Sequence, residues 1–381
     1  MIFNDGVLDD AAALAAGDPE GMLEAIATGG AQIRRSLLWV RENDALFSAL
    51  TADGRPRALM VCGIGGSAVA GDIVHAATIA QSPIPVLSHR GYALPAWVGA
   101  LDVVIAVSCS GETEETLTIF DEAVRRGCRV IAIGSKGSAL AKRAEQANTH
   151  FVTIDPGGRP PRANLWSLTI PVLRIADALG VANFPVSALE AIADALDAEA
   201  LISGPHVDFD QNPAKTLAYS LAGKLPVVWG STPLGGVAAY RFAAQCAENA
   251  DYPCLHGELP EPNHNQVVMF DGVLGAQLSS DGDVFSDRLG DQSADMALSL
   301  FLLRDLDEYD KNRRRAQICV DLATERGISV QEIRTDAEHA LARFAAMVAR
   351  IDFATSYLGL GFGINPSDIS PIMALKDRIS R

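Results

Sequence analysis

The stretch RALMVCGIGGSAVAGD, residues 57–72, predicts the architecture with which the chain begins. The apolar run before Gly63 is typical of a buried strand, and the glycine-rich turn leads into a helix that opens at Ser67. Glycines let the backbone turn sharply and approach a ligand, and the free N–H groups at a helix start attract anions. The turn at Gly65 and Gly66 therefore suits a bound phosphate. A tight turn capped by Ser67, without any ligand, explains the same residues.

Strands and helices continue to alternate after residues 57–72. Val- and Ile-rich runs at 84–89, 101–108 and 128–135 predict strands, with a helix at 113–127 between the last two. A second alternation predicts strands at 225–231, 298–305 and 328–335 and helices at 235–249, 312–327 and 339–360. Strands that alternate with helices imply parallel sheets covered on both faces. We expect an N-terminal helical segment at 1–50 and two α/β lobes at 51–180 and 181–381.

Composition narrows the class of protein. The 381 residues suit two domains at roughly 150 residues each, and the net charge of −16 argues against a nucleic-acid binder. No uncharged apolar run of 18 residues is present, and MIFNDGVLDD lacks a basic region and an apolar signal core, so we expect a cytoplasmic protein that does not enter a membrane. The six cysteines show no CxxC spacing, which favours buried, reduced thiols.

The stretch SCSGETEET, residues 108–116, carries the second chemical signal. Ser108, Ser110 and Thr113 place hydroxyl groups on one loop between a strand and a helix, where backbone N–H groups are also available. Strand ends of one sheet share an edge, so this loop and the glycine-rich turn should hold one phosphate between them. The simpler alternative is that these Ser and Thr residues only cap the following helix, without binding a ligand. There is no GxxxxGK[ST] motif, so a nucleoside triphosphate is not indicated.

A dinucleotide site is a further alternative, because GIGGSA, residues 63–68, approximates GxGxxA. The acid expected after the next strand is missing, and only Arg90 could serve an NADP-type site. Zinc chemistry is not indicated, because no HxH, HExxH or clustered Cys/His pattern appears.

Several stretches resemble the SIS-domain bifunctional phosphoglucose/phosphomannose isomerases in order and spacing. They are GIGGSAVAGD, SCSGETEET, PRANL, AYRFAAQCAENADYP, ELPEPNHNQVV and the tail INPSDISPIMALKDRI. The resemblance implies an α/β fold of two SIS subdomains, each a flavodoxin-like, three-layer parallel-sheet unit, with extra helices. It implies a homodimer with shared active sites, and a metal-independent isomerase without a cofactor that converts glucose 6-phosphate or mannose 6-phosphate to fructose 6-phosphate.

The resemblance also implies roles for individual residues. Ser67, Ser108, Ser110 and Thr113 would hold the phosphate, and the reacting end would be lined by Arg162, Glu248, His264 and Lys376. The chemistry is consistent with this. Glu248 falls at a predicted helix end, where the dipole and Asp251 disfavour its ionised form, which suits a base for an enediolate reaction. His264, between two amides in NHNQ, suits proton transfer in ring opening. Arg162 could stabilise the enediolate, and Lys376 could balance O1 or the phosphate.

Two positions depart from the family's pattern: Glu112 replaces an asparagine, and Gln266 replaces a glutamate. A carboxylate beside a phosphate cradle is repulsive unless it points away or pairs with a cation. A sugar-phosphate-binding regulatory protein with weakened catalysis is therefore a second hypothesis, and an NADP-dependent dehydrogenase is a third.

Overall fold

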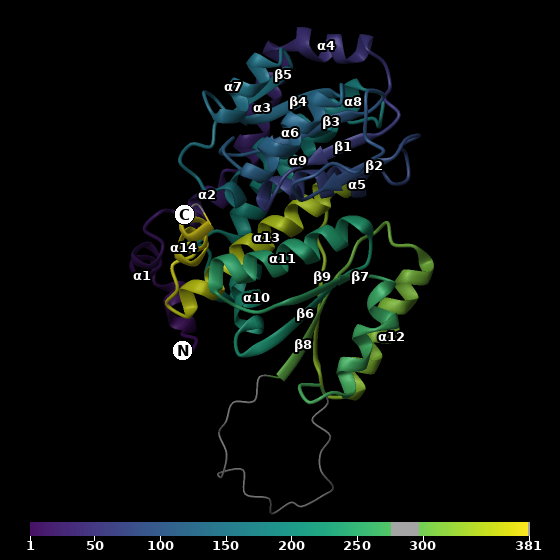
Figure 1. Ribbon diagram of the computed structural model, residues 1–381. Coiled ribbons are helices and arrows are strands. Elements are labelled where there is room, and N and C mark those ends of the chain that lie inside the picture. Colours follow the sequence, from purple (N-terminus) through teal and green to yellow (C-terminus); the bar gives the residue numbers. More distant parts are fainter. Residues whose placement is uncertain (276–296, 380–381) are drawn as a thin grey trace, which may run out of the picture. The chain divides into compact units, whose positions relative to one another are not determined.

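The computed structural model describes residues 1–275 and 297–379 (Figure 1). The chain forms two compact units. One is continuous, Ala25–Asp197, and the other joins Met1–Glu24 to Ala198–Arg381. This grouping differs from the expected segments 1–50, 51–180 and 181–381. Residues 25–50 fall in the continuous unit because α3 (Gly29–Glu42) packs on α8 (Leu165–Ala178), where Ser167 Oγ donates to Gln32 Oε1 at 3.3 Å.

The continuous unit is built on a five-stranded parallel sheet with the order β2-β1-β3-β4-β5. Its strands are β1 (Leu59–Cys62), β2 (Val86–His89), β3 (Val103–Ser108), β4 (Arg129–Ser135) and β5 (His150–Ile154). Its remaining helices are α4 (Asp44–Ala52), α5 (Gly66–Thr78), α6 (Glu114–Arg125), α7 (Ala139–Gln146) and the 3₁₀ turn η2 (Pro161–Asn164). α5 and α8 pack on the strands together, and α6 and α7 pack on them as a second pair, which makes three layers.

The discontinuous unit repeats this plan with four parallel strands in the order β7-β6-β8-β9. They are β6 (Lys224–Gly230), β7 (Leu255–Glu258), β8 (Ala297–Leu303) and β9 (Ser329–Ile333). The helices are α1 (Ala11–Gly17), α10 (Pro213–Leu221), α11 (Pro233–Ala250), α12 (Asp310–Glu325), α13 (Ala340–Gly361) and α14 (Ser370–Ile379), with 3₁₀ turns η1 (Asp5–Asp9), η3 (Phe209–Gln211), η4 (Glu261–His264) and η5 (Gln266–Asp271). α2 (Met22–Ala27) and α9 (Val186–Ser203) span the points where the chain passes between units.

The cores follow from the sequence pattern. Central strands of parallel sheets are buried on both faces and so read as continuous apolar runs, as β1, β3 and β8 do. α6 and α7 cover one core, which includes Phe120 and Ile119, and α12 and η5 cover another, which includes Trp229 and Phe270. The predicted α/β class with parallel sheets is confirmed. All six cysteines are free thiols, and all but Cys254 are buried.

Candidate functional site

The glycine-rich turn after β1 lies at the carboxyl edge of its sheet and leads directly into α5. Gly65 has a φ of 57°, a conformation that favours glycine, and it is exposed. A Cβ at Gly66 would lie 3.3 Å from backbone atoms of Arg162, so a larger residue would have to shift η2 by a few tenths of an ångström. The turn is thereby open to solvent at Gly65 and fixed against η2 at Gly66.

The second loop, after β3, is joined to the first by a hydrogen bond. The Cys109 N–H donates to Ser67 Oγ at 3.2 Å. Ser108 is fully buried, and its hydroxyl accepts from the Gly111 N–H and donates to Thr113 Oγ1, both at 3.0 Å. Ser110 is exposed and Thr113 is half-buried. Ser110 Oγ accepts from the Glu112 N–H at 3.2 Å, and Ser108 holds the loop in shape through its bonds to Gly111 and Thr113.

The carboxylate of Glu112 turns away from this loop. Its Oε1 accepts from the Ala139 N–H at 2.8 Å, at the first residue of α7. An acid at a helix start satisfies an otherwise unpaired N–H and interacts favourably with the helix dipole. The departure at this position therefore places no negative charge inside the loop that follows β3.

Arg162 lies in η2 with only 4 % of its surface exposed, on the backbone that meets Gly66. A second arginine of the same segment, Arg159, was not among the predicted site residues. It donates to Asn164 Oδ1 through Nε at 3.3 Å and through NH2 at 3.1 Å, and Asn164 returns a bond to the Arg159 carbonyl. Burial, together with the charge of Arg35, lowers the pKa of Arg159. Burial raises the pKa of Cys109 to about 11, against a smaller opposite effect of Arg159. The positive charge of Arg159 therefore reaches the loop after β3.

Glu248 stands near the end of α11, as the sequence predicted. The helix ends at Ala250, and Asp251 adopts the left-handed conformation with a φ of 49°. Glu248 is half-buried. The end of α11 packs tightly on α13, because a Cβ at Gly359 would lie 2.1 Å from the Asn249 carbonyl oxygen, and Asn249 Nδ2 donates to Thr355 Oγ1 at 3.0 Å. The backbone beneath Glu248 is therefore rigidly held.

The amides of NHNQ fix the segment that presents His264. Asn263 Nδ2 donates to Cys319 Sγ at 2.9 Å, and Asn265 Nδ2 donates to Glu261 Oε1 at 2.8 Å. His264 itself is exposed at the end of η4. The side chains on either side of the imidazole are thus used to hold the turn, which leaves the ring directed to solvent.

The second departure from the family's pattern is Gln266, whose amide makes two hydrogen bonds. Its Oε1 accepts from the indole N–H of Trp229 at 2.6 Å, and its Nε2 donates to the His256 carbonyl at 3.0 Å. Trp229 is fully buried and stacks on Phe270. One amide side chain therefore joins β6, β7 and the His264 segment, and a carboxylate could not make the bond to His256.

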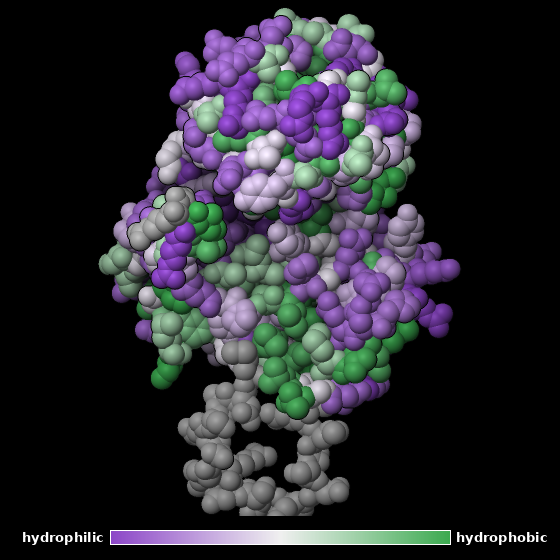
Figure 2. All heavy atoms as spheres, in the orientation of Figure 1, coloured by the Kyte–Doolittle hydropathy of each residue, from purple (hydrophilic) through white to green (hydrophobic). Residues whose placement is uncertain are grey.

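Lys376 is exposed on α14. No residue of α14 is buried, and Ile372, Met373 and Leu375 expose between 39 % and 58 % of their surface. Figure 2 shows hydrophobic side chains beside hydrophilic ones over this helix. The helix therefore presents Lys376 on an uncovered, partly apolar surface.

The predicted residues fall into two groups. Gly65, Gly66, Ser67, Ser108, Ser110, Thr113 and Arg162 meet at the carboxyl edge of one sheet, around the point between β1 and β3 where the strand order reverses. Open α/β sheets bind ligands at this point. Glu248, His264 and Lys376 come from α11, η4 and α14 of the other unit.

The structure gives no support to a dinucleotide site. Arg90, the residue on which that hypothesis depends, pairs with Asp72 of α5, with NH1 3.0 Å from Asp72 Oδ1. Within residues 1–275 and 297–379, no group of three or more His, Cys, Asp or Glu side chains could hold a metal ion. In the same residues no helix is long and apolar enough to cross a membrane.

Comparisons with known proteins agree with the resemblance. Residues 210–379 match the family described as the bacterial phospho-glucose isomerase C-terminal SIS domain. The bifunctional phosphoglucose/phosphomannose isomerase of Caldicellulosiruptor bescii is 30% identical over 84% of this chain and 89% of its own length, and that of Thermoplasma acidophilum is 29% identical over the same shares. The fold matches tagatose-6-phosphate ketose/aldose isomerase from Escherichia coli with a TM-score of 0.66 and 14% identity, over 90% of this chain and 93% of that one. The chain belongs to the family of the bifunctional phosphoglucose/phosphomannose isomerases.

Proposed function

We propose that this chain, a sugar-phosphate isomerase by its family, interconverts glucose 6-phosphate and mannose 6-phosphate with fructose 6-phosphate through an enediolate. The observation that carries the proposal is the pair of loops at the carboxyl edge of the first sheet, which the Cys109–Ser67 hydrogen bond joins. Hydroxyls, backbone N–H groups and nearby guanidinium groups make a cradle for a phosphate monoester. A chain with a net charge of −16 needs such local donors to hold an anion.

The phosphate is held by Ser67, Ser110 and Thr113 in this proposal. The Ser67 oxygen accepts from Cys109, which leaves its hydrogen for a ligand, and Ser110 and Thr113 are accessible. Ser108 supports the loop and does not contact the phosphate, because its hydroxyl is buried and bonded to Gly111 and Thr113. Gly65 and Gly66 let the backbone approach the phosphate.

The remaining groups act on the sugar. His264 moves the proton between O1 and O5 during ring opening, because an imidazole accepts and donates protons near neutral pH. Glu248 takes the proton from C2 of the aldose and returns it to C1. The enediolate is planar at C2 and therefore the same from either epimer, so one base serves both sugars. Arg162 and Lys376 stabilise the negative oxygen. No metal or cofactor takes part.

The proposal includes a homodimer in the cytoplasm in which two chains complete each site. The exposed His264 turn and the uncovered α14 suit a role at a chain junction. The orientation of Glu112 weakens the regulatory alternative, since its carboxylate caps α7 and does not oppose a phosphate.

A coupled assay of fructose 6-phosphate formation from each aldose, with and without EDTA, tests the function. Glu248→Gln should lower both activities in parallel by about 10²–10⁴-fold, the usual loss of a positioned base, while sugar-phosphate binding persists. Glu325→Gln is a matched control, because Glu325 also ends a helix and is 69% exposed. Near-normal turnover of either sugar by Glu248→Gln would refute the base, and an unmutated chain that binds but converts neither sugar would support the regulatory alternative.

A further inference from the structure

The four strands of the second sheet repeat the order of the first four strands of the first sheet, so the loops after β1 and β3 have counterparts in the second sheet. β7-β6-β8-β9 repeats β2-β1-β3-β4, and in both sheets the order reverses between the first pair of central strands. The counterpart of the Ser67 turn is the segment at Ser231, after β6, and the counterpart of the loop at Ser108 is residues 304–309, between β8 and α12. The second sheet therefore has the same place for an anion at its carboxyl edge.

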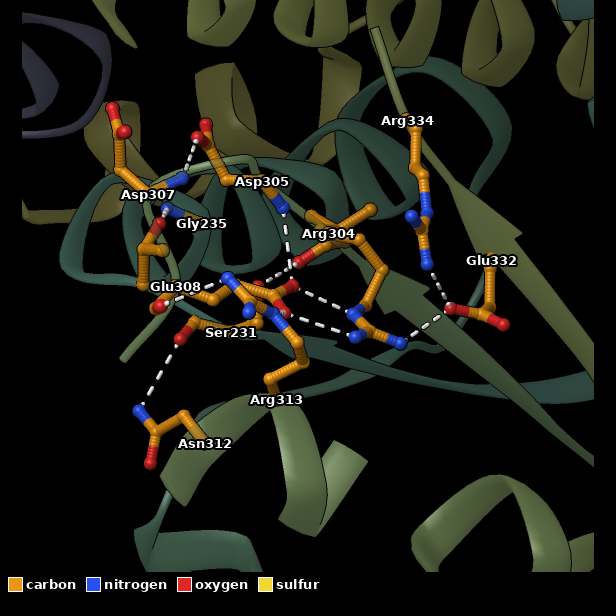
Figure 3. A network of polar contacts seen from close by, with 12 residues as sticks. Ser231, Gly235, Arg304, Asp305, Asp307, Glu308, Asn312, Arg313, Glu332 and Arg334 are labelled. Carbon is orange, nitrogen blue, oxygen red and sulfur yellow. Dashed lines mark hydrogen bonds and ion pairs between the residues drawn. The ribbon is translucent and has the colours of Figure 1, made fainter. Parts of the chain in front are cut away.

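That place is surrounded by donors (Figure 3). Arg304 follows β8 directly and is 5 % exposed. Its guanidinium group donates two hydrogen bonds to the carboxylate of Glu308, from Nε to Oε1 at 2.6 Å and from NH2 to Oε2 at 2.9 Å. The Asp305 N–H donates to Glu308 Oε1 at 3.2 Å, and the Ser231 hydroxyl, which donates to the Leu303 carbonyl at 2.9 Å, lies beside this carboxylate. Arg313 Nε lies 3.8 Å from Glu308 Oε2.

The electrostatics agree that the carboxylate is held as an anion. Burial alone would raise the pKa of Glu308, but the bonds from Arg304 and the Asp305 N–H, with the Ser231 hydroxyl close by, outweigh it and lower the pKa. The side chain of Glu308 is only 2% exposed, so these donors replace its water. Two arginines and a backbone N–H are also among the groups that proteins use to bind phosphate and sulfate.

We propose that the second sheet carries a second oxyanion site, built like the sugar-phosphate cradle of the first and filled by the chain's own Glu308 carboxylate. The native chain therefore binds one sugar phosphate, at the first sheet. Without that carboxylate, the site takes a small tetrahedral oxyanion such as inorganic phosphate or sulfate. This inference does not depend on the isomerase activity, because it concerns only the donors around Glu308.

Glu308→Ala tests the inference, with thermal unfolding followed from 0 to 100 mM phosphate against chloride at constant ionic strength. For a dissociation constant near 1 mM, the melting temperature should rise by roughly 5 °C more than that of the unmutated chain. Glu332→Ala is the matched control. Glu332 also pairs with Arg304, but it is 30% exposed and bonds only the outer NH1. Its phosphate response should equal that of the unmutated chain, as should that of Glu308→Gln, in which the amide still fills the site.

The loss of the buried partner of Arg304 could prevent folding of Glu308→Ala, so refolding yield in phosphate and in chloride is a second measurement. Phosphate-dependent recovery of Glu308→Ala, absent from Glu332→Ala, supports the inference. A crystal of Glu308→Ala grown in sulfate should show the ion within about 3 Å of the Arg304 guanidinium. An equal phosphate response in all variants, a failure of phosphate to restore folding, or water alone at that position would each overturn it.

Discussion

Replacing Gln266 by methionine separates the support of the His264 segment from its chemistry. The substitution keeps the length of the side chain but removes both hydrogen bonds, to the Trp229 indole at 2.6 Å and to the His256 carbonyl at 3.0 Å. Trp229 is fully buried, so its N–H would lose its partner without gaining water, at about 1–3 kcal/mol. His256 is exposed, and water can satisfy its carbonyl. We therefore expect the substitution to destabilise the folded segment by about 2 kcal/mol.

If all of this cost appears as local opening of the segment, kcat/KM falls by up to about 30-fold, since about 1.4 kcal/mol corresponds to tenfold. Steady-state rates with glucose 6-phosphate, together with urea unfolding, measure the two effects. Gln266→Glu is the matched control, because a carboxylate keeps the bond from Trp229 and loses only the one to His256. We expect its kcat/KM to stay within about threefold of the unmutated value. A fully active and stable Gln266→Met, or a glutamate variant that loses as much activity as the methionine variant, would refute this role of Gln266.

Three further expectations follow from the same residues. Glu112→Gln should leave KM for the sugar phosphate within about twofold, because the carboxylate caps α7; binding tightened tenfold would mean that it faces the phosphate after all. Light scattering at assay concentration should give about twice the chain mass of 40.2 kDa, and a fully active monomer would contradict the shared site. Burial raises the pKa of Cys109 to about 11, so only about one thiol in a thousand is ionised at pH 8 and its alkylation should speed up about tenfold per pH unit towards pH 11. Mass spectrometry should find the half-buried Cys254 modified first at pH 8, and equal rates for the two would refute the burial argument.

The sequence predicted the central strands and the loops that follow them, because fully buried parallel strands read as apolar runs and glycines and hydroxyl residues mark the turns. The edge strands β5 and β7 were missed. Three of the five residues of β5 are only partly buried, and most of β7 is exposed, so neither strand is a continuous apolar run in the sequence. Glu248 and His264 were placed correctly on a helix end and an exposed turn, since local signals define both.

What the sequence could not predict are partners that lie far apart along the chain. Nothing near Glu112 indicates that it caps a helix starting 27 residues later, and nothing near Gln266 indicates Trp229, which precedes it by 37. Arg159 was missed for a related reason. Its neighbour Arg162 fits the family's pattern, whereas the importance of Arg159 depends on its closeness to Cys109, which only the folded chain provides.

The division of the chain into a continuous and a discontinuous unit bears on how the protein is made. Residues 25–197 are complete early in translation and can fold while the ribosome still synthesises the rest. The other unit must wait for α13, whose residues are nearly all buried, and the N-terminal segment waits with it. The Asn4 N–H donates to the Gly361 carbonyl at 2.8 Å, and the Phe3 ring fills the space beside Gly361. At about 5–20 residues per second, Phe3 stays without its partner Gly361 for on the order of ten seconds or more after its own synthesis, and during that time it is available to chaperones.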